Sequence, residues 1–279
     1  EVLIEKNIDF IFTNPNKQNF KITERSLKGT NVKLINTAST GLNHIELNDC
    51  KRLGIDVFSL TKDYEIIRNL PSTAELGFGL LLSLIRKIPD SSNSVSIGEW
   101  DYEPYVGRQL SGMTAGIIGY GRLGKLFHKY CKSFGANVKI FDPYIKNRSN
   151  FFTSLNKLLK NSDVISFHIH ANNNYKFLDR TKLNLMKKNV IIVNTSRGEI
   201  IDEKAVVAFL KKNKKAKIAS DVLFDEINDK FSGTLYKYSL KNRNQVIITP
   251  HIGGMTTEGQ KIAYIHAANK LARFLKWVK

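Results

Sequence analysis

The chain has 279 residues, 42% of them hydrophobic and 24% charged, which is typical of a globular protein with one large or two modest domains. The formal net charge is +18, but the basic residues are scattered, and their densest cluster, 211–215, ends an expected helix, where lysine is favourable. We therefore expect no nucleic-acid partner. We expect no membrane partner either, because the longest apolar stretch, around 76–85, is too short to span a bilayer. Only Cys50 and Cys131 occur, far apart and without metal-ligand spacing, so we expect neither a disulfide framework nor a metal site. A reducing, cytoplasmic location is therefore expected.

The first 72 residues alternate between expected strands and a helix. Strands are predicted at 8–12, 32–36 and 56–59, and a helix near 43–53. This alternation predicts a small α/β domain over residues 1–72. A linking helix over 72–88 follows, with Ser72 or Thr73 as its cap, and the polar run 89–96 is expected to be a loop.

A glycine-rich turn follows the next apolar strand. Gly119, Gly121 and Gly124 have the GxGxxG spacing, and an amphipathic helix comes directly after them. Gly119 allows the tight turn, Gly121 lets the backbone approach a pyrophosphate, and Gly124 lets the helix pack on the strand. The strand at 138–141 ends in Asp142, 18 residues beyond Gly124, where an acid reaches the ribose hydroxyls of NAD and repels the 2′-phosphate of NADP. The pattern predicts an NAD site.

Strands and helices continue to alternate through the rest of the chain. Helices are expected at 154–160, near 181–186 and at 202–212, where Asp202 is a good N-cap; strands are expected at 164–168, 190–194, 217–222 and 246–249. Together these elements predict a doubly wound parallel sheet, a Rossmann domain over 73–257. A last helix, 256–277, lies beyond the final strand, and we expect the segment 258–279 to return to the first domain.

A series of motifs in this order resembles the D-isomer-specific 2-hydroxyacid dehydrogenases, including the phosphoglycerate-dehydrogenase-like members. The motifs lie at Ser39–Ile45, Ser72–Glu75, Gly116–Gly124, Asn194–Gly198, Ser220–Val222 with Glu226, and Thr249–Gly254. The resemblance implies an NAD-dependent oxidoreductase that interconverts a D-2-hydroxy acid and its 2-oxo acid. It also implies that the smaller first domain is flavodoxin-like and binds the substrate.

The same resemblance implies that Arg197, Glu226 and His251 are catalytic. His251 would move the proton on the C2 oxygen, because imidazole titrates near neutral pH. Glu226 would orient the imidazole and favour its protonated form, and Arg197 would bind the substrate carboxylate with its planar fork. Asp225 is a rival to Glu226, since the family usually has proline after this glutamate and Ile227 stands here.

Binding residues are also implied by the resemblance. The backbone around Ser39, Thr40 and Gly41 would contribute N–H groups to the substrate carboxylate. Arg122 and Leu123 would offer backbone N–H groups to the pyrophosphate, and Asp221 would hold the nicotinamide carboxamide. The complete expected cofactor site consists of Gly119, Gly121, Arg122, Leu123, Gly124, Asp142, Thr195 and Asp221.

The chain departs from the family pattern in three places. It begins about one strand–helix unit late, so we expect an N-terminally truncated substrate domain. His168-Ile169-His170 replaces a His-x-Pro motif, which predicts altered loop geometry with cofactor binding retained. Residues 13–16 lack the arginine of phosphoglycerate-specific members and leave Lys17 as the nearby cation, which weakens the expectation for 3-phosphoglycerate. No regulatory domain is expected after Lys279.

The expected partners are a small anionic 2-oxo or 2-hydroxy acid and a second copy of the chain. We expect a homodimer formed through the nucleotide domain, with the linking helix and the segment through Trp100 at the interface. Two alternatives stay open. One is a non-enzymatic, NAD-sensing regulatory protein of the corepressor kind, which the basic charge mildly favours. The other is a formate or phosphite dehydrogenase with the same fold and cofactor.

Overall fold

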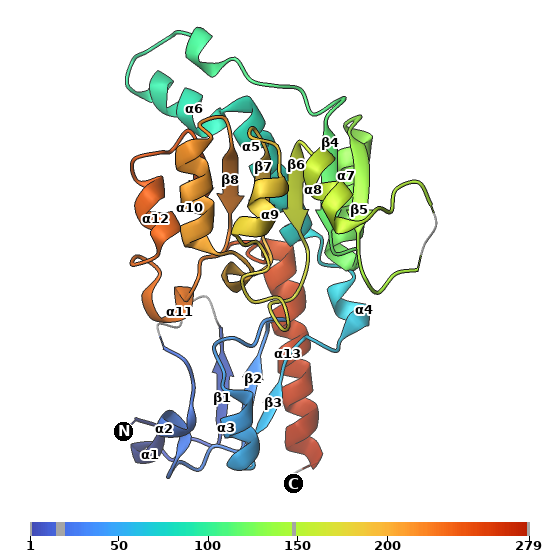
Figure 1. Ribbon diagram of the computed structural model, residues 1–279. Coiled ribbons are helices and arrows are strands. Elements are labelled where there is room, and N and C mark those ends of the chain that lie inside the picture. The colour runs from blue at the N-terminus through green and yellow to red at the C-terminus, as the bar shows by residue number, and fades with distance from the viewer. Residues whose placement is uncertain (1, 15–19, 147–148, 278–279) are drawn as a thin grey trace. The chain divides into compact units, whose positions relative to one another are not determined.

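The computed structural model describes residues 2–14, 20–146 and 149–277 (Figure 1). The chain divides into two compact units, which we call the small unit and the large unit. The small unit comprises Glu1–Leu70 with Gly254–Lys279, and the large unit comprises Pro71–Gly253. That the small unit binds substrate stays a prediction.

The small unit contains a parallel sheet in the order β1-β2-β3. Its strands are β1 (Phe10–Thr13), β2 (Leu34–Thr37) and β3 (Asp56–Phe58), and Phe10 pairs with Leu34 in the register. Four short helices accompany them: α1 (Val2–Glu5), α2 (Glu24–Leu27), α3 (Leu47–Arg52) and α4 (Tyr64–Ile67). The buried core of this unit is formed by Ile22, Leu27, Val32, Ile35, Ile45, Cys50 and Ile55.

The C-terminal helix α13 (Thr257–Trp277) packs within the small unit. The buried Asn36 side chain, on β2, donates a hydrogen bond to the Ala267 carbonyl at 2.8 Å. Phe274 makes edge contacts with Phe10 and Phe58, at ring-centroid distances of 6.2 and 5.5 Å. Residues more than two hundred positions apart in the sequence therefore share one core.

The large unit is built on six parallel strands in the order β5-β4-β6-β7-β8-β9. They are β4 (Thr114–Ile118), β5 (Asn137–Phe141), β6 (Val164–Phe167), β7 (Ile191–Asn194), β8 (Lys217–Ser220) and β9 (Val246–Ile248). The chain runs from β4 to β5 on one side and then crosses to β6 on the other side. The switch point therefore lies at the carboxyl ends of β4 and β6, where ligands bind in such sheets.

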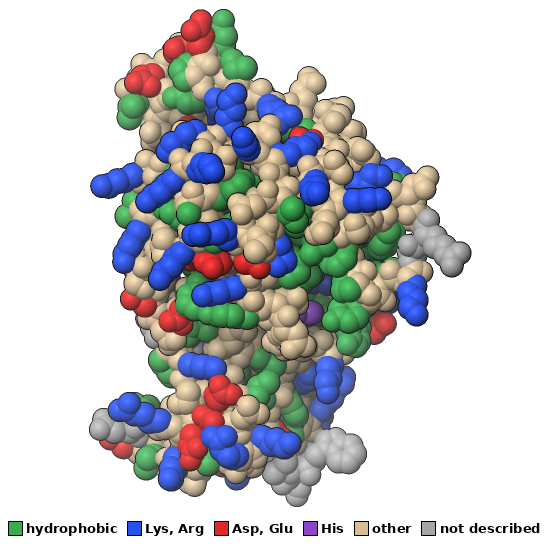
Figure 2. Space-filling model, in the orientation of Figure 1, with side chains coloured by type: hydrophobic (Ala, Val, Ile, Leu, Met, Phe, Trp, Pro, Cys, Tyr) green, Lys and Arg blue, Asp and Glu red, His purple; other side chains and the backbone are tan. Residues whose placement is uncertain are grey.

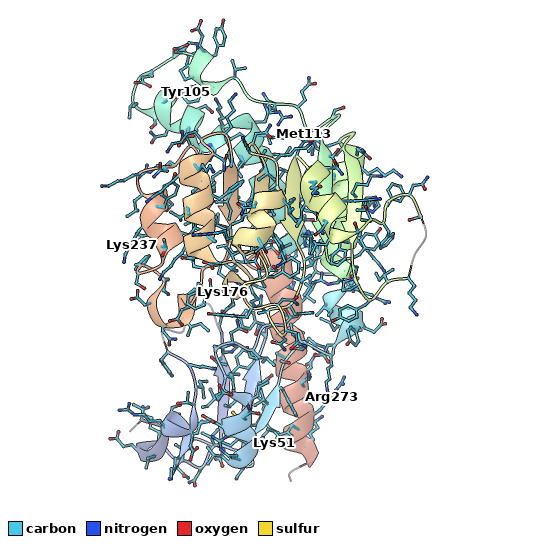
Figure 3. The ribbon with its side chains drawn as sticks, viewed as in Figure 1. Lys51, Tyr105, Met113, Lys176, Lys237 and Arg273 are labelled. Atoms are coloured by element: carbon cyan, nitrogen blue, oxygen red, sulfur yellow. The ribbon has the colours of Figure 1, made fainter. Side chains whose placement is uncertain are left out.

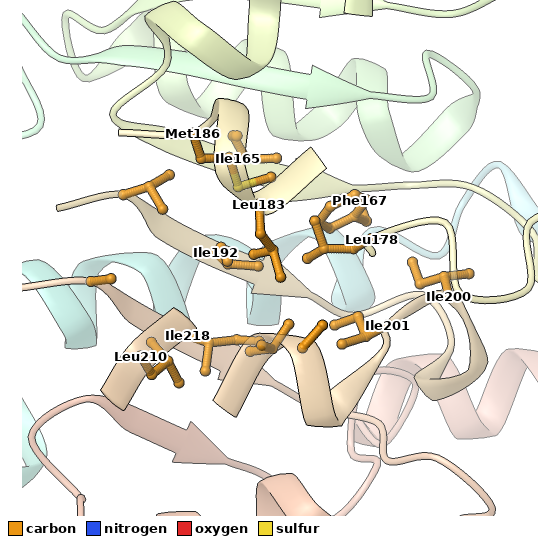
Figure 4. Packing of buried hydrophobic residues seen from close by; sticks show 14 of the residues in the cluster. Ile165, Phe167, Leu178, Leu183, Met186, Ile192, Ile200, Ile201, Leu210 and Ile218 are labelled. Atoms are coloured by element: carbon orange, nitrogen blue, oxygen red, sulfur yellow. The ribbon is translucent and has the colours of Figure 1, made fainter. Parts of the chain in front are cut away.

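Helices cover both faces of this sheet, which confirms the predicted doubly wound fold. Along β7, Ile192 packs into one hydrophobic cluster and Ile191 and Val193 into the other, because alternate side chains point to opposite faces. Figure 4 shows the first cluster, in which Ile192 and Ile218 pack with Leu210. The helices are α5 (Ser72–Arg86) and α7 (Arg122–Ser133) on one face, and α8 (Leu155–Asn161), α9 (Arg180–Leu185), α10 (Glu203–Lys212) and α12 (Thr234–Ser239) on the other.

Two local expectations for this region are wrong. The polar run 89–96 is helical, within α6 (Ile88–Ser96), because Lys87 takes a left-handed φ of 56° that ends α5 and Pro89 fits the first turn of a new helix. The N-cap of α5 is Pro71, not Ser72 or Thr73, because Ser72 is already the first residue of the helix. The Asp202 cap is confirmed: its side chain accepts a hydrogen bond from the Ala205 N–H at 3.1 Å.

The segment between α6 and β4 exposes large side chains. It contains a 3-10 turn, η2 (Glu103–Tyr105), with Tyr105 labelled in Figure 3. Trp100 is 91% exposed and Tyr102 is 79% exposed. An exposed aromatic pair of this kind is a common feature of protein–protein contacts.

The charged side chains are spread over the surface. Figure 2 shows lysine and arginine distributed widely over one face, with aspartate and glutamate between them. Among the residues that the structure describes, no helix is long and apolar enough to cross a membrane. The same residues contain no cluster of His, Cys, Asp and Glu suited to hold a metal ion.

Candidate active site

The glycine-rich loop after β4 is shaped by close backbone approaches. Gly119 has a φ of 91°, and its N–H donates to the Phe141 carbonyl at 2.9 Å. A Cβ on Gly119 would lie 2.4 Å from the His168 oxygen, and one on Gly124 would lie 2.1 Å from the Gly119 oxygen. A Cβ on Gly121 would meet nothing within 4 Å. Two glycines are thus required by the fold, while the third borders open space that suits a pyrophosphate.

Arg122 and Leu123 form the first turn of α7. The Lys125 N–H donates to the Gly121 carbonyl at 3.0 Å, which begins the helical hydrogen-bond pattern, so the N–H groups of Arg122 and Leu123 lie at the helix N-terminus. The Arg122 guanidinium is half-buried at the same point, and this burial lowers its pKa. The N-terminus of a twelve-residue helix with a cation beside it fits a cofactor phosphate.

Asp142 stands at the end of β5, where an acid is expected to reach the ribose. Its Oδ2 accepts a hydrogen bond from the Tyr120 N–H at 2.8 Å, and its Oδ1 accepts one from the Tyr144 N–H at 2.9 Å. The Tyr120 hydroxyl in turn pairs with His128 Nδ1 at 2.7 Å. The carboxylate therefore also braces the glycine-rich loop, a role that the spacing alone did not suggest.

The turn after β7 positions Arg197. Asn194 is fully buried: its Oδ1 accepts hydrogen bonds from the Ser196 N–H and hydroxyl at 3.1 and 2.8 Å, and its Nδ2 donates to the Arg197 carbonyl at 2.9 Å. Thr195 is buried against α5, where a Cβ on Gly77 would lie 3.3 Å from its hydroxyl. Sequence reasoning missed the role of Asn194, although an amide that ends an apolar strand is a signal for it.

Asp221, directly after β8, holds the loop that carries His251. Its Oδ1 accepts hydrogen bonds from the Thr249 hydroxyl at 2.6 Å and the Ile252 N–H at 2.8 Å, and its Oδ2 accepts one from the Gly253 N–H at 2.8 Å. Burial raises the pKa of the Asp221 carboxyl, although these hydrogen bonds and His251 oppose the shift. The predicted contact with the nicotinamide carboxamide stays a prediction, and the structure adds a bracing role.

His251 follows β9 in a left-handed backbone conformation, with a φ of 54°. Its N–H donates to the carbonyls of Asp221 and Thr249, both at 2.9 Å. Its Nδ1 pairs with Glu226 Oε1 at 2.5 Å, and Glu226 Oε2 accepts a hydrogen bond from the Leu223 N–H at 3.0 Å. Both oxygens of the Glu226 carboxylate are therefore engaged.

Glu226, and not Asp225, lies against His251. Asp225 takes a left-handed φ of 53° just before the short helix α11 (Glu226–Asp229), and its Oδ1 accepts a hydrogen bond from Asn228 Nδ2 at 2.6 Å. The two adjacent carboxylates therefore have different partners, Asn228 for Asp225 and His251 for Glu226.

The electrostatics of the pair favour an ionised Glu226. Burial alone would raise the pKa of this carboxyl, but the hydrogen bond and charge of His251, the Leu223 N–H and the charge of Arg197 outweigh it. The pKa of Glu226 therefore lies below its ordinary value. The structure pairs Glu226 with His251 beyond the carboxyl ends of β8 and β9. Arg197 follows β7, its guanidinium donates to the Ser196 carbonyl at 2.6 Å, and its charge contributes to the low pKa of Glu226.

Ser39, Thr40 and Gly41 lie in the small unit, after β2. The Ser39 hydroxyl donates to the Gly41 carbonyl at 2.7 Å, and the Thr61 hydroxyl donates to the Thr40 carbonyl at 3.0 Å. The loop therefore has internal and external hydrogen bonds, and its role with substrate stays a prediction. Pro15, Asn16 and Lys17, on which the expectation about 3-phosphoglycerate depends, lie outside the described residues.

His168 forms part of the packing beside the glycine-rich loop. It shares a hydrogen bond with the Ser166 hydroxyl at 3.0 Å, and its ring lies 5.1 Å from that of Phe127. Burial lowers the pKa of His168 to about 3, so the imidazole is neutral at physiological pH.

Comparison with known proteins decides the family. Residues 78–253 match the profile of the D-isomer specific 2-hydroxyacid dehydrogenase, NAD binding domain. The chain belongs to this family. The predicted family, and NAD as the cofactor of the large unit, are thereby confirmed.

Its relatives include D-3-phosphoglycerate dehydrogenase of Methanocaldococcus jannaschii, 36% identical over 256 residues, an alignment that covers 89% of this chain and 47% of the relative. Hydroxypyruvate reductase of Thermotoga maritima is 32% identical, with 88% and 79% covered. The structure of D-lactate dehydrogenase from Aquifex aeolicus, complexed with NAD and lactic acid, aligns with a TM-score of 0.80 at 28% identity and covers 96% of this chain and 83% of that one. The chain spans about half the length of the phosphoglycerate dehydrogenases that it matches.

Proposed function

We propose that this protein is an NAD-dependent oxidoreductase that interconverts a D-2-hydroxy acid and its 2-oxo acid. The observation that carries the proposal is the Glu226–His251 pair, 2.5 Å apart, with the Arg197 charge acting on the same carboxylate. The three groups lie beyond the carboxyl edge of a parallel sheet that carries an NAD-binding loop. Family membership supports the same conclusion.

The cofactor, when bound as NADH, supplies the hydride that reduces C2 of the 2-oxo acid. His251 donates a proton to the C2 oxygen in this direction and accepts it in the reverse direction. Since Nδ1 is engaged with Glu226, we assign the proton transfer to Nε2. Glu226 fixes the ring and stabilises the imidazolium, as the low pKa of its carboxyl permits.

Arg197 is assigned to the substrate carboxylate. Guanidinium presents a planar fork of donors that matches a carboxylate, and Asn194 fixes the turn from which it projects. We further propose that the backbone of Ser39, Thr40 and Gly41 contributes N–H groups to the same carboxylate.

The test is oxidation of NADH, followed at 340 nm, with a panel of pyruvate, hydroxypyruvate, glyoxylate and 3-phosphohydroxypyruvate. We expect turnover with at least one of them, and a large rise in KM with a fall in kcat for Arg197→Ala. An unchanged KM in that variant would contradict carboxylate binding by Arg197. NADH binding without turnover on any 2-oxo acid would overturn the enzymatic proposal.

We also propose a cytoplasmic homodimer. The cysteines Cys50 and Cys131 are both unpaired and buried, as suits a reducing compartment. The exposed Trp100 and Tyr102 offer an aromatic surface to a second copy. Sedimentation equilibrium of the wild type and of Trp100→Ala would test the assembly, and a monomer at micromolar wild-type concentration would contradict it.

A further inference from the structure

The Glu226 carboxylate is carried by a segment that leaves the sheet. Residues 224–235 run outward after β8, form the single turn of α11, and return to the core at Leu235, which is 1% exposed. Two large side chains of the segment, Phe224 and Phe231, are 38% and 62% exposed. Phe224 contacts Tyr175 and Phe231 contacts Tyr236, at ring-centroid distances of 6.3 and 5.0 Å, so the apolar contacts of these two exposed side chains are made near the surface.

A second carboxylate, outside the proposed catalytic set, holds both ends of this segment. Glu203 is the first residue of α10; its Oε1 accepts a hydrogen bond from the Phe224 N–H at 3.3 Å, and its Oε2 accepts one from the Leu235 N–H at 3.0 Å. The backbone at Gly233 also lies close, since a Cβ there would be 3.1 Å from Oε2. One side chain thus joins two backbone N–H groups that are eleven residues apart.

The backbone that Glu203 holds is the backbone that meets the catalytic pair. The Phe224 N–H donates to Glu203, and the neighbouring Leu223 N–H donates to Glu226 Oε2 at 3.0 Å. The Leu223 backbone also meets the turn that carries Arg197, since a Cβ on Gly198 would lie 2.1 Å from the carbonyl carbon of Leu223. The position of Leu223 and Phe224 therefore bears on both Glu226 and Arg197.

Glu203 projects from a rigid element. Helix α10 buries Val206 and Leu210 completely in the sheet-facing core, and Asp202 caps its N-terminus. A side chain anchored on a packed helix can hold a loop more closely than the loop can hold itself.

We propose that Glu203 is a positioning residue for the Glu226–His251 pair, and that it acts by closing the segment 224–235 at both ends. The inference rests on the proposed oxidoreductase function. Without the Glu203 carboxylate, two backbone N–H groups lose their acceptors, and the Glu226 oxygens no longer keep a fixed distance from His251. Small displacements of catalytic groups lower the rate strongly.

The experiment compares Glu203→Ala with Asp202→Ala. The second variant removes a hydrogen bond at the same helix terminus, from the Ala205 N–H, and leaves the segment 224–235 with its acceptors. Both variants are expected to unfold at a lower temperature than the wild type. Only Glu203→Ala should show faster amide hydrogen exchange at Phe224 and Leu235, and a kcat lower by about tenfold or more at an unchanged Kd for NADH.

A double variant separates positioning from general destabilisation. If Glu203 acts through Glu226, adding Glu203→Ala to Glu226→Ala should lower kcat by less than about twofold further. Glu203→Gln, which keeps one acceptor oxygen, should restore part of the lost kcat and part of the exchange protection.

The outcomes distinguish this inference from the proposed function. Unchanged amide exchange at Phe224 and Leu235 in Glu203→Ala overturns the positioning role whether or not the protein turns over 2-oxo acids. Equal losses of kcat in Glu203→Ala and Asp202→Ala, or full additivity in the double variant, also overturn it. Absence of wild-type turnover overturns the proposed function, and amide exchange still decides whether Glu203 holds the segment.

Discussion

The loop after β4 and the loop after β9 both leave the sheet through a residue with a positive φ. In the first loop this residue is Gly119, with a φ of 91°, and in the second it is His251, with a φ of 54°. Glycine adopts this conformation at no steric cost, whereas an imidazole-bearing residue must be held in it by its surroundings. The Asp221 carboxylate and carbonyl supply that restraint, through hydrogen bonds from the Thr249 hydroxyl and from the N–H groups of residues 251–253.

The glycine-rich loop takes its shape because glycine has no side chain. The His251 loop takes its shape because side chains from other segments hold it. The glycine-rich loop leaves room for a ligand, because Gly121 borders open space. The His251 loop is held from two other segments, because Glu226 pairs with the imidazole and Asp221 accepts a hydrogen bond from the Ile252 N–H.

Alanine substitutions in the glycine-rich loop should show the largest effect. In Gly124→Ala the new Cβ would lie 2.1 Å from the Gly119 oxygen, so we expect a fall in Tm and loss of NADH binding. In Gly121→Ala the new Cβ meets no protein atom within 4 Å, so Tm should stay within about 2 °C of the wild type while NADH affinity falls at least about tenfold. Thermal unfolding and NADH fluorescence titration measure the two quantities. Unchanged affinity in Gly121→Ala would show that the pyrophosphate does not lie there.

Removal of the Glu226 charge should have the next largest effect. We expect Glu226→Gln to lower kcat at least about tenfold, since an amide stabilises an imidazolium less well than a carboxylate. The pKa of this carboxyl is lowered in the folded protein, so ionised Glu226 contributes stability above its ordinary pKa of 4.5 that is lost as the pH falls through the lower folded value.

Urea unfolding across this pH range tests the sign of the shift. The margin by which the wild type exceeds Glu226→Gln in stability should shrink as the pH falls below 4.5. A margin that grows as the pH falls below 4.5 would contradict the lowered pKa of Glu226.

Substitution of the neighbouring carboxylate should have the smallest effect. Asp225→Asn keeps a residue that tolerates the left-handed φ of 53°, and it removes a charge that faces Asn228 instead of His251. We expect kcat and KM within about twofold of the wild type. A loss of activity equal to that of Glu226→Gln would restore Asp225 as the rival to Glu226 for the carboxylate that assists His251.

Local patterns in the sequence predicted the large unit closely. The expected strand 190–194 is observed as Ile191–Asn194, and the expected helix 202–212 as Glu203–Lys212 with its Asp202 cap. Apolar periodicity, glycine spacing and capping residues each act within a few positions, so they can be read along the chain. The helix α6 was missed because its break from α5 depends on the backbone of Lys87, a residue with no intrinsic preference for a left-handed φ.

The candidate site was harder to predict from the sequence, because its contacts join residues that are far apart along the chain. The pairing of Glu226 with His251 was expected from family resemblance, and nothing in the spacing of 25 residues required it. Resemblance to the family also did not reveal the backbone hydrogen bonds accepted by Asn194, Asp221 and Glu203. These roles follow from burial and from which N–H groups need an acceptor, and both depend on the tertiary fold.

The most direct test of the catalytic assignment is turnover by His251→Ala with NADH and the best 2-oxo acid of the panel. We expect kcat to fall by about 10²- to 10⁴-fold while the Kd for NADH stays within about twofold, because the imidazole transfers a proton and the cofactor is bound by other residues. Undiminished turnover in His251→Ala, with NADH bound normally, would contradict this assignment.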